Sequence, residues 1–321
     1  MKWHEANQEV TIAGNTDMYA YAGPIDKSGY ASICEVLEAN KARRANALLI
    51  LCTNGGDANA GYRIARALTH HYGSDNFRVA APAECKSAGT LICIGASSLV
   101  VFDRGELGPL DVQFQKKDEI FQQSSGLDIL RGMTYIKSDA LSAFNEYMLS
   151  INGGSGLSTK VASEIASNLV NGMYSPMYAQ IDPIRLGEMN AALQVAHEYG
   201  TRLNAKSKNL KVGALKKLIN DYPTHGFVID RAEARELFEK VVGPTDAERV
   251  FGDFVKEAMW KTGRRTSPHV MNLTEFVQSV LEPKNEPIPV VPASEPQGAD
   301  GAASAGQQAA AGPASAGNGT E

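Results

Sequence analysis

The chain has 321 residues, 43% of them hydrophobic, and a formal net charge of −5. This length suits one or two globular domains with a sizeable core, and the acidic balance gives no global case for nucleic-acid binding. No run approaches the roughly 18 apolar residues of a membrane helix, and the N-terminal MKWHEANQEV lacks the apolar region of a signal peptide. The four cysteines show neither CxxC nor metal-ligand spacing, so we expect no metal site, and three of them sit inside apolar runs, which favours reduced core thiols in a cytoplasmic protein.

The first half of the chain alternates short apolar runs with helical patterns. Strands are predicted over 17–22, 47–52, 78–81 and 99–102, and helices over 30–43, 60–71 and 91–96. This alternation predicts an α/β core of βαβ units with a mostly parallel sheet and right-handed crossovers. We place the core at residues 17–150, after an N-terminal segment, 1–16, that has no informative pattern.

The second half is mostly helical. Residues 114–125 are polar with little periodicity, which favours an excursion such as a lid, and INGGSG at 151–156 reads as a loop. Helices are predicted over 127–149, 161–170, 186–203, 215–219, 232–238 and 247–260. Together they predict a helical extension over 151–282. From residue 283 to 321 the chain is mainly Pro, Ala, Gly, Ser and Gln, so we expect a disordered tail.

The strongest chemical signal follows the strand at 78–81. Ser87 precedes Ala88 and Gly89 at the start of a predicted helix, where a hydroxyl can lie beside free backbone N–H groups. Such an arrangement supplies a nucleophile and an oxyanion hole. The alternative is that Ser87 is an ordinary N-cap, because serine is a favoured cap residue.

Two adjacent glycines, Gly55 and Gly56, follow the strand at 47–52. In parallel sheets, sites form beyond the carboxyl ends of the strands, so these glycines and Ser87 should lie on the same edge. Glycines let backbone N–H groups face a ligand without obstruction by side chains. The alternative is a plain turn between a strand and a helix.

These motifs and three others, in the same order, resemble a known family. The segment LCTNGG over 51–56, followed by KSAGT over 86–90, is similar to the glycine-rich turn and the nucleophile segment of Clp proteases and signal peptide peptidases. The match then narrows through LGPLDVQ at 107–113, IDP at 181–183 and YPTH at 222–225. With these segments the chain resembles the serine dehydrogenase proteinase family, a group of serine peptidases with the Clp/crotonase fold.

The resemblance implies a serine peptidase that hydrolyses peptide bonds through an acyl-enzyme on Ser87, without metal or other cofactor. It also implies that the N–H groups of Gly55 or Gly56 and of Ala88 form the oxyanion hole, where each donor is typically worth about 3 kcal/mol of barrier. Peptide or protein substrates and a homo-oligomer are implied as well, since this fold class commonly assembles into rings or stacked trimers.

The general base is open. Asp111 stands close to where Clp proteases have their histidine, and residues 88–196 contain no histidine. Asp111 is nonetheless a candidate site residue, since it could orient a base or cap a loop. Signal peptide peptidases use a lysine instead, and Lys137 stands at a comparable distance after Ser87. Lys137 could act as the base if it were buried; otherwise it is a solvated helix residue.

Three further side chains are candidate participants. His225 in YPTH could supply the imidazole, or it is simply a turn residue beside proline. Lys86 adjoins Ser87 but is expected to point the opposite way as a surface charge. Cys85 could rival Ser87 as the nucleophile, but it is expected to be packed.

Two other functions stay open at this stage. A crotonase-like acyl-thioester enzyme would share the oxyanion-hole geometry, but crotonases stabilise an enolate and need no serine at this position. A catalytically weak scaffold or adaptor would keep the fold and display the tail, and the absence of histidine from 88–196 keeps this alternative open.

Overall fold

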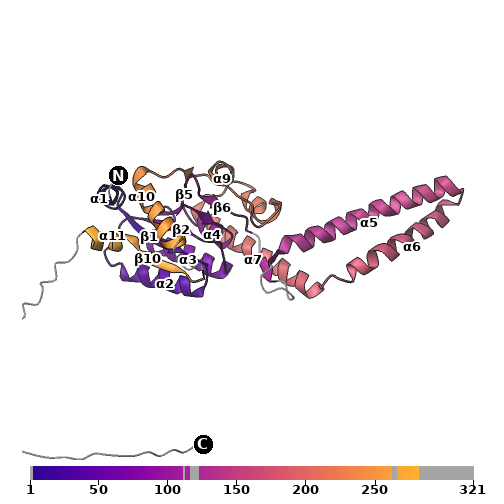
Figure 1. The fold of residues 1–321 in the computed structure, drawn as a ribbon, viewed down its shortest axis with the longest axis horizontal. Helices are drawn as coiled ribbons and strands as arrows, with labels where there is room; N and C mark the ends of the chain where they lie inside the picture. Colours follow the sequence, from indigo (N-terminus) through magenta and orange to yellow (C-terminus); the bar gives the residue numbers. More distant parts are fainter. Residues whose placement is uncertain (1–2, 111–112, 116–122, 262–265, 282–321) are drawn as a thin grey trace, which may run out of the picture. The chain divides into compact units, whose positions relative to one another are not determined.

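The fold is built on a six-stranded sheet with the strand order β10-β1-β2-β3-β5-β9 (Figure 1). The structure is a computed structural model that describes residues 3–110, 113–115, 123–261 and 266–281. The strands are β1 Thr16–Ala22, β2 Asn46–Cys52, β3 Phe77–Ala81, β5 Ser98–Val101, β9 Val241–Val242 and β10 His269–Asn272. Neighbouring strands are parallel except β1 and β10, which are antiparallel. The predicted α/β fold with a mostly parallel sheet is therefore confirmed.

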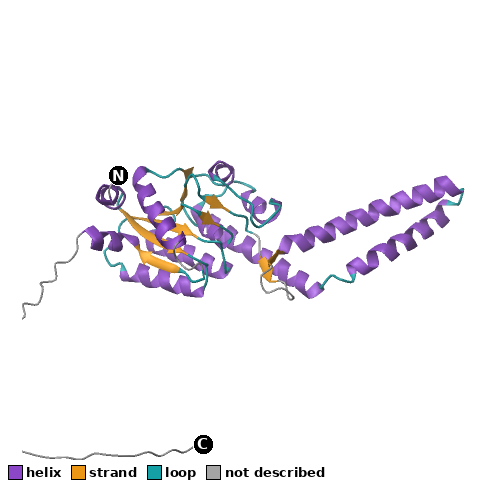
Figure 2. Cartoon of the chain, in the orientation of Figure 1, coloured by secondary structure: helices purple, strands orange, loops and turns teal. Residues whose placement is uncertain are grey.

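Helices cover both faces of this sheet (Figure 2). On one face, Tyr19 and Leu49 pack with residues of α2 Lys27–Ala39 and α3 Ala58–Tyr72. On the other face, Met18 and Leu48 pack with α10 Asp246–Phe254, the π-helix η3 Val255–Lys261 and α11 Leu273–Leu281. Successive residues of a strand point to opposite faces, which is why β1 and β2 are continuous apolar runs.

The helices begin where a side chain can satisfy their free N–H groups. Asp26 accepts from the N–H of Gly29 at the start of α2, and Asp57 accepts from the N–H of Asn59 at the start of α3. Asp182 does the same for α7 Pro183–Ser207, whose first residue is a proline with no N–H to satisfy. The IDP segment is therefore a helix start.

The helices α5 Gly126–Ser155 and α6 Thr159–Tyr178 pack against each other. The loop expected at 151–156 is wrong, because α5 continues to Ser155 and ends only at Gly156, whose φ is +67°. Glycine inside a helix costs about 1 kcal/mol relative to alanine, and pairing with α6 offsets that cost. At the other end of α5, β7 Gln113–Gln115 and β8 Gln123–Ser125 pair antiparallel within the segment expected to be a polar excursion.

The C-terminal half covers the residues 151–282 that were expected to form a helical extension. It contains α8 Ala214–Lys216, the π-helix η2 Lys217–Asp221 and α9 Arg231–Leu237, but also β9 and β10, which form the two edges of the sheet. Residues 1–283 make up one compact unit, and the tail expected from 283 lies outside the described residues. Nowhere in the described chain is a helix both long and apolar enough to span a membrane.

Candidate active site

Ser87 lies between the two-residue strand β4 Glu84–Cys85 and the helix α4 Ala88–Ile94. Lys86 N–H donates to Thr53 O at 2.9 Å and Thr53 N–H donates to Glu84 O at 2.7 Å, which ties this segment to the end of β2. Ser87 itself has φ 51° and ψ −111°, a backbone conformation that residues other than glycine rarely adopt. Such strain is typical of functional positions.

The hydroxyl of Ser87 makes no helix-cap hydrogen bond. The interpretation of Ser87 as an ordinary N-cap is therefore wrong, although the residue does occupy the N-cap position of α4. Its side chain is half-buried and faces a cavity instead.

Gly55 and Gly56 lie against Ser87, as the sequence predicts. Their φ angles are +104° and +144°, which favour glycine. A Cβ on Gly55 would lie 2.7 Å from the Ser87 Cβ, and a Cβ on Gly56 would lie 2.2 Å from Ile25 O. Only glycine fits at either position, so the turn lets the backbone approach the serine directly.

The backbone donors around Ser87 differ in what they bind. Gly55 N–H donates to Thr53 Oγ1 at 3.0 Å, while Gly55 O accepts from Ile25 N–H at 2.9 Å. Because the N–H and C=O of a trans peptide point opposite ways, Gly56 N–H points away from Ile25. Among the described residues no acceptor is recorded for the N–H of Gly56 or of Ala88. Ala88 is the first residue of α4, where a helix leaves its N–H groups unsatisfied.

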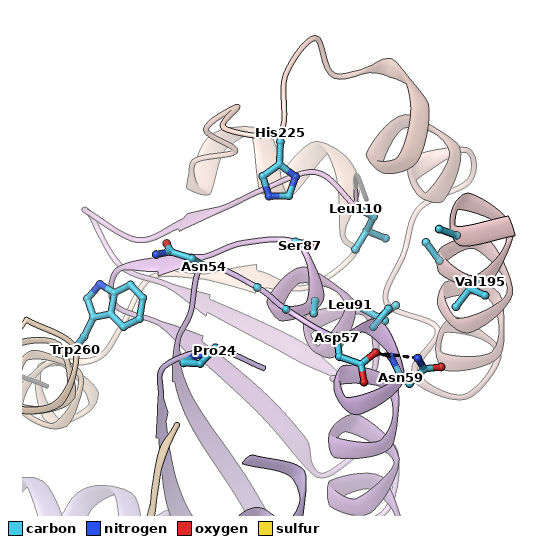
Figure 3. A pocket seen from close by; sticks show the side chains of 16 residues that line it. Pro24, Asn54, Asp57, Asn59, Ser87, Leu91, Leu110, Val195, His225 and Trp260 are labelled. Carbon is cyan, nitrogen blue, oxygen red and sulfur yellow. Dashed lines mark hydrogen bonds between the residues drawn. The ribbon is translucent and has the colours of Figure 1, made fainter. Parts of the chain in front are cut away.

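Ser87 and these donors line a cavity of about 620 Å³ (Figure 3). Its polar lining includes Asn54, Asp57 and His225. Its apolar wall comes from α4, from Leu110 and from one face of α7, and consists of Leu91, Leu110, Ala192, Val195 and Ala196. Tyr199 Oη on α7 donates to Asn59 Oδ1 on α3 at 2.8 Å, which fixes this wall beside the glycine turn. A volume of this size is typical of small-ligand or peptide side-chain sites.

His225 reaches the same cavity from far along the chain. Figure 3 shows its imidazole pointing into the cavity on the side of Ser87. The segment that carries it is fastened on two sides. Arg131 donates to Pro223 O at 2.7 Å, and Ile229 pairs with Leu107 through two backbone hydrogen bonds of 2.8 and 3.0 Å.

The structure separates the other candidates for the base. Lys137 is exposed on α5 and does not line the cavity. Asp111 lies outside the described residues, immediately after Leu110 of the cavity wall. The expectation that Lys86 is a surface charge is wrong: its Nζ lies 2.7 Å from Glu106 Oε1 and donates to Leu107 O and Phe227 O at 3.3 Å. Gly108 makes room for it, since a Cβ there would lie 2.6 Å from Lys86 Cδ.

Cys85 is fully buried, as expected. Contact with the Cys93 thiol, together with burial, raises the pKa of Cys85 well above its ordinary value. Because the thiolate is the reactive form, this environment does not suit a nucleophile.

Sequence reasoning missed Trp260, which lines the cavity from η3. Its Nε1 donates at 2.7 Å to Oε2 of Glu84, the first residue of β4, which precedes Ser87. Nothing local in the sequence marks this tryptophan, because the contact joins segments far apart in the chain. In the part of the chain that the structure describes, no cluster of His, Cys, Asp or Glu side chains could hold a metal ion.

Solved structures similar to this chain include proteases. A point mutant of the 1510-N membrane-bound stomatin-specific protease is 15% identical, with a TM-score of 0.27 over 46% of this chain and 67% of that one. A second mutant of that protease, in complex with a substrate peptide, is 13% identical, with a TM-score of 0.28 over 75% and 96%. A ClpP1 mutant from Listeria monocytogenes is 14% identical, with a TM-score of 0.23 over 49% and 81%.

Neither the protein-family models nor the curated proteins include a match to this chain.

Proposed function

We propose that the chain is a serine peptidase with Ser87 as its nucleophile, as its resemblance to the serine dehydrogenase proteinase family implies. The observation that carries the proposal is the surroundings of this serine. Ser87 has a strained backbone, and its hydroxyl makes no helix-cap hydrogen bond but faces the cavity. The same cavity is lined by Gly56 and Ala88, whose N–H groups have no recorded acceptor among the described residues. Acyl transfer needs a nucleophile next to hydrogen-bond donors that can stabilise an oxyanion, and this site offers both.

In this proposal Ser87 Oγ attacks the carbonyl carbon of the scissile peptide bond while His225 accepts the hydroxyl proton. The negative charge that develops on the carbonyl oxygen is stabilised by the N–H groups of Gly56 and Ala88, because Gly55 N–H is already donated to Thr53 Oγ1. The C–N bond then breaks, and His225 returns the proton to the leaving amine. Water then attacks the ester carbonyl while His225 accepts a proton from it, and His225 returns that proton to Ser87 Oγ as the ester C–O bond breaks.

We assign to Asp111 the role of orienting His225. Asp111 follows Leu110 of the cavity wall in the chain, and a carboxylate that holds the imidazole is the usual third member of such a set. Lys137 has no part in the proposed mechanism, since it is exposed on α5.

The apolar wall supports a peptide substrate with a small or medium-sized apolar side chain next to the scissile bond. Leu91, Val195 and Ala196 offer contact area without a charged group. A buried acidic side chain of the substrate would find no lysine or arginine on this wall, so acidic residues at that position would be poor substrates.

The experiment is covalent labelling with a fluorophosphonate, followed by mass spectrometry of the intact chain and its peptides. The wild type should gain one adduct on Ser87, and the Ser87→Ala variant should gain none. Ser142→Ala, which changes an exposed serine on α5, should label like the wild type. A wild type that stays unlabelled, or labels elsewhere, would contradict the proposal. Binding of coenzyme A without a serine adduct would instead support the acyl-thioester alternative.

A further inference from the structure

A second cavity, of about 440 Å³, lies between α3 and α7. Arg66 and His70 reach it from α3, and Arg202 and Lys206 reach it from α7. None of the residues that line it is acidic. The proposed peptidase mechanism uses none of these side chains.

The cations around this cavity lack strong counter-charges. Within the described residues, no ion pair is recorded for Arg66 or Lys206, and the recorded contact of the Arg66 guanidinium is with the Tyr62 ring, at 5.7 Å from its centroid. Arg202 contacts Glu198 at 3.3 Å, but both side chains are about 60% exposed. An exposed ion pair of this kind contributes little to stability, so the Arg202 guanidinium can also contact another anion.

We propose that this cavity is a binding site for a small phosphorylated molecule that carries at least two negative charges. Arginine guanidinium groups match phosphate oxygens in geometry and charge, and lysine adds a point charge. The volume suits a ligand of a few tens of atoms. The half-buried Tyr62 offers an aromatic edge for an organic part, since its ring is stacked on Tyr199 at 4.1 Å and held in place.

Both cavities are lined in part by α3 and α7. Asn59 lines the catalytic cavity and Tyr62, one turn further along α3, lines the phosphate site. Tyr199 contacts both, since its hydroxyl donates to Asn59 and its ring stacks on Tyr62. A ligand that bridges Arg66 and Lys206 would hold α7 against α3 and so stabilise the wall around Val195. This coupling rests on the proposed peptidase function, whereas the binding site does not.

Isothermal titration of the full chain with inorganic pyrophosphate tests the binding site. The wild type should bind, and binding should weaken when the salt is raised from about 0.05 to about 0.3 M, because exposed charges are screened. Arg66→Gln and Lys206→Gln should each weaken binding about tenfold. Lys160→Gln, which removes an exposed charge from α6, is the matched control and should bind like the wild type.

If the wild type gave no heat of binding, or if Lys160→Gln weakened pyrophosphate binding as much as Arg66→Gln does, the proposed site would be wrong. Circular dichroism of each variant shows whether it is folded, and these exposed substitutions should leave the spectrum unchanged.

The coupling is tested separately in a peptidase assay. Pyrophosphate should lower KM for a peptide severalfold in the wild type and in Lys160→Gln, but not in Arg66→Gln. Pyrophosphate binding with no change in KM would overturn the coupling. If Ser87 took no part in hydrolysis, the titrations would be unaffected, so failure of the peptidase proposal and failure of the phosphate site give different results.

Discussion

Ser87 combines a backbone at positive φ with a hydroxyl that makes no cap hydrogen bond. Replacing a serine that does cap a helix costs about 1 kcal/mol of stability. Ser87→Ala should lower the free energy of unfolding by less than about 0.5 kcal/mol, because no helix-cap hydrogen bond is lost. It should lower kcat/KM by about a thousandfold or more, because the nucleophile is gone. Thermal unfolding and peptide hydrolysis measure the two effects; a clear loss of stability with unchanged turnover would restore the cap interpretation.

His225 and Lys137 make a matched pair for the identity of the base. His225 points into the cavity, whereas Lys137 is exposed on α5. A general base typically contributes about 10²–10⁴-fold, so His225→Ala should lower kcat by that factor. Lys137→Met should leave kcat within about twofold, since surface changes away from the site are usually neutral. Steady-state kinetics decides, and the reverse pattern would favour a serine–lysine dyad.

Lys86 connects the nucleophile segment with the segment that carries His225. Its ammonium contacts Glu106, Leu107 O and Phe227 O, and only 10% of its side chain is exposed. Lys86→Met should lower the free energy of unfolding by about 2–3 kcal/mol, because a half-buried carboxylate and two carbonyls lose their partner. It should also lower kcat, whereas KM should change little, since the lysine positions His225 and does not line the cavity.

Denaturant titration and kinetics test Lys86 together. Lys216→Met changes an exposed lysine of α8 for which no ion pair is recorded within the described part of the chain, and it is the control for loss of charge. A Lys86→Met variant with wild-type stability and kcat would show that the contact between the two segments is dispensable.

Site residues that directly follow predicted strands can be predicted from the sequence, whereas residues brought in from distant segments cannot. Ser87 and the two glycines each follow a strand directly, and parallel strands bring such positions to one edge, so their proximity is predictable. His225 and Trp260 come from segments after η2 and in η3, and only tertiary packing brings them to the cavity. The burial of Lys86 cannot be predicted from its neighbours in the sequence either, because the space it occupies depends on Gly108 in a separate segment of the chain.

At the scale of elements, a buried network joins β1 to α2 and α3. Asp17 Oδ2 accepts from Asn40 Nδ2 at 3.0 Å, from Arg44 N–H at 2.9 Å and from Tyr72 Oη at 2.8 Å. Tyr19 and Tyr72 are hydrogen-bonded to each other within this network. Burial, then the contacts with Tyr19 and Asp17, raise the pKa of Tyr72 above the ordinary value of 10.0.

Because of this network, we expect the protein to lose stability at alkaline pH. In the unfolded chain Tyr72 ionises near its ordinary pKa of 10.0, whereas in the folded chain its pKa is higher. The stability that this tyrosine contributes is therefore fully present below pH 10 and is lost as the pH rises beyond it. The melting temperature should fall above pH 10 and fall less steeply in Tyr72→Phe. Parallel curves for the two proteins would show that the pKa of Tyr72 does not differ between the folded and unfolded states.

The elements of the core are predictable because each βαβ unit carries its own apolar periodicity and turn residues. The errors share one cause, which is that tertiary contacts outweigh weak local signals. The glycines at 153 and 154 look like a loop, yet α5 continues through them beside α6. The strands β9 and β10 have two and four residues, too few for a pattern, and only pairing with β5 and β1 defines them.

At the scale of the whole molecule, α6 carries an apolar stripe that the rest of the described chain leaves exposed. Its members recur at every fourth residue and are 37–52% exposed: Val161, Ile165, Leu169, Met173 and Met177. The neighbouring face of α6 is covered, since Ala162 and Ala166 are fully buried. Rows of residues at this spacing form the ridges that pack into the grooves of another helix, and contiguous exposed apolar surface marks an interaction site.

We expect this stripe, hereafter the α6 stripe, to support self-association, in agreement with the homo-oligomer that the family resemblance implies. The wild type should therefore exceed the monomer mass in light scattering at micromolar concentration. Leu169→Glu combined with Met173→Glu should shift it toward the monomer, because each new carboxylate would have to be desolvated in the contact.

Asn168→Glu combined with Asn171→Glu places the same charges on exposed positions of α6 beside the stripe and should leave the mass unchanged. A monomeric wild type, or equal dissociation of both double variants, would contradict a role for the α6 stripe. The substituted side chains of both variants are exposed, so both should keep the melting temperature of the folded monomer, which separates loss of assembly from loss of fold.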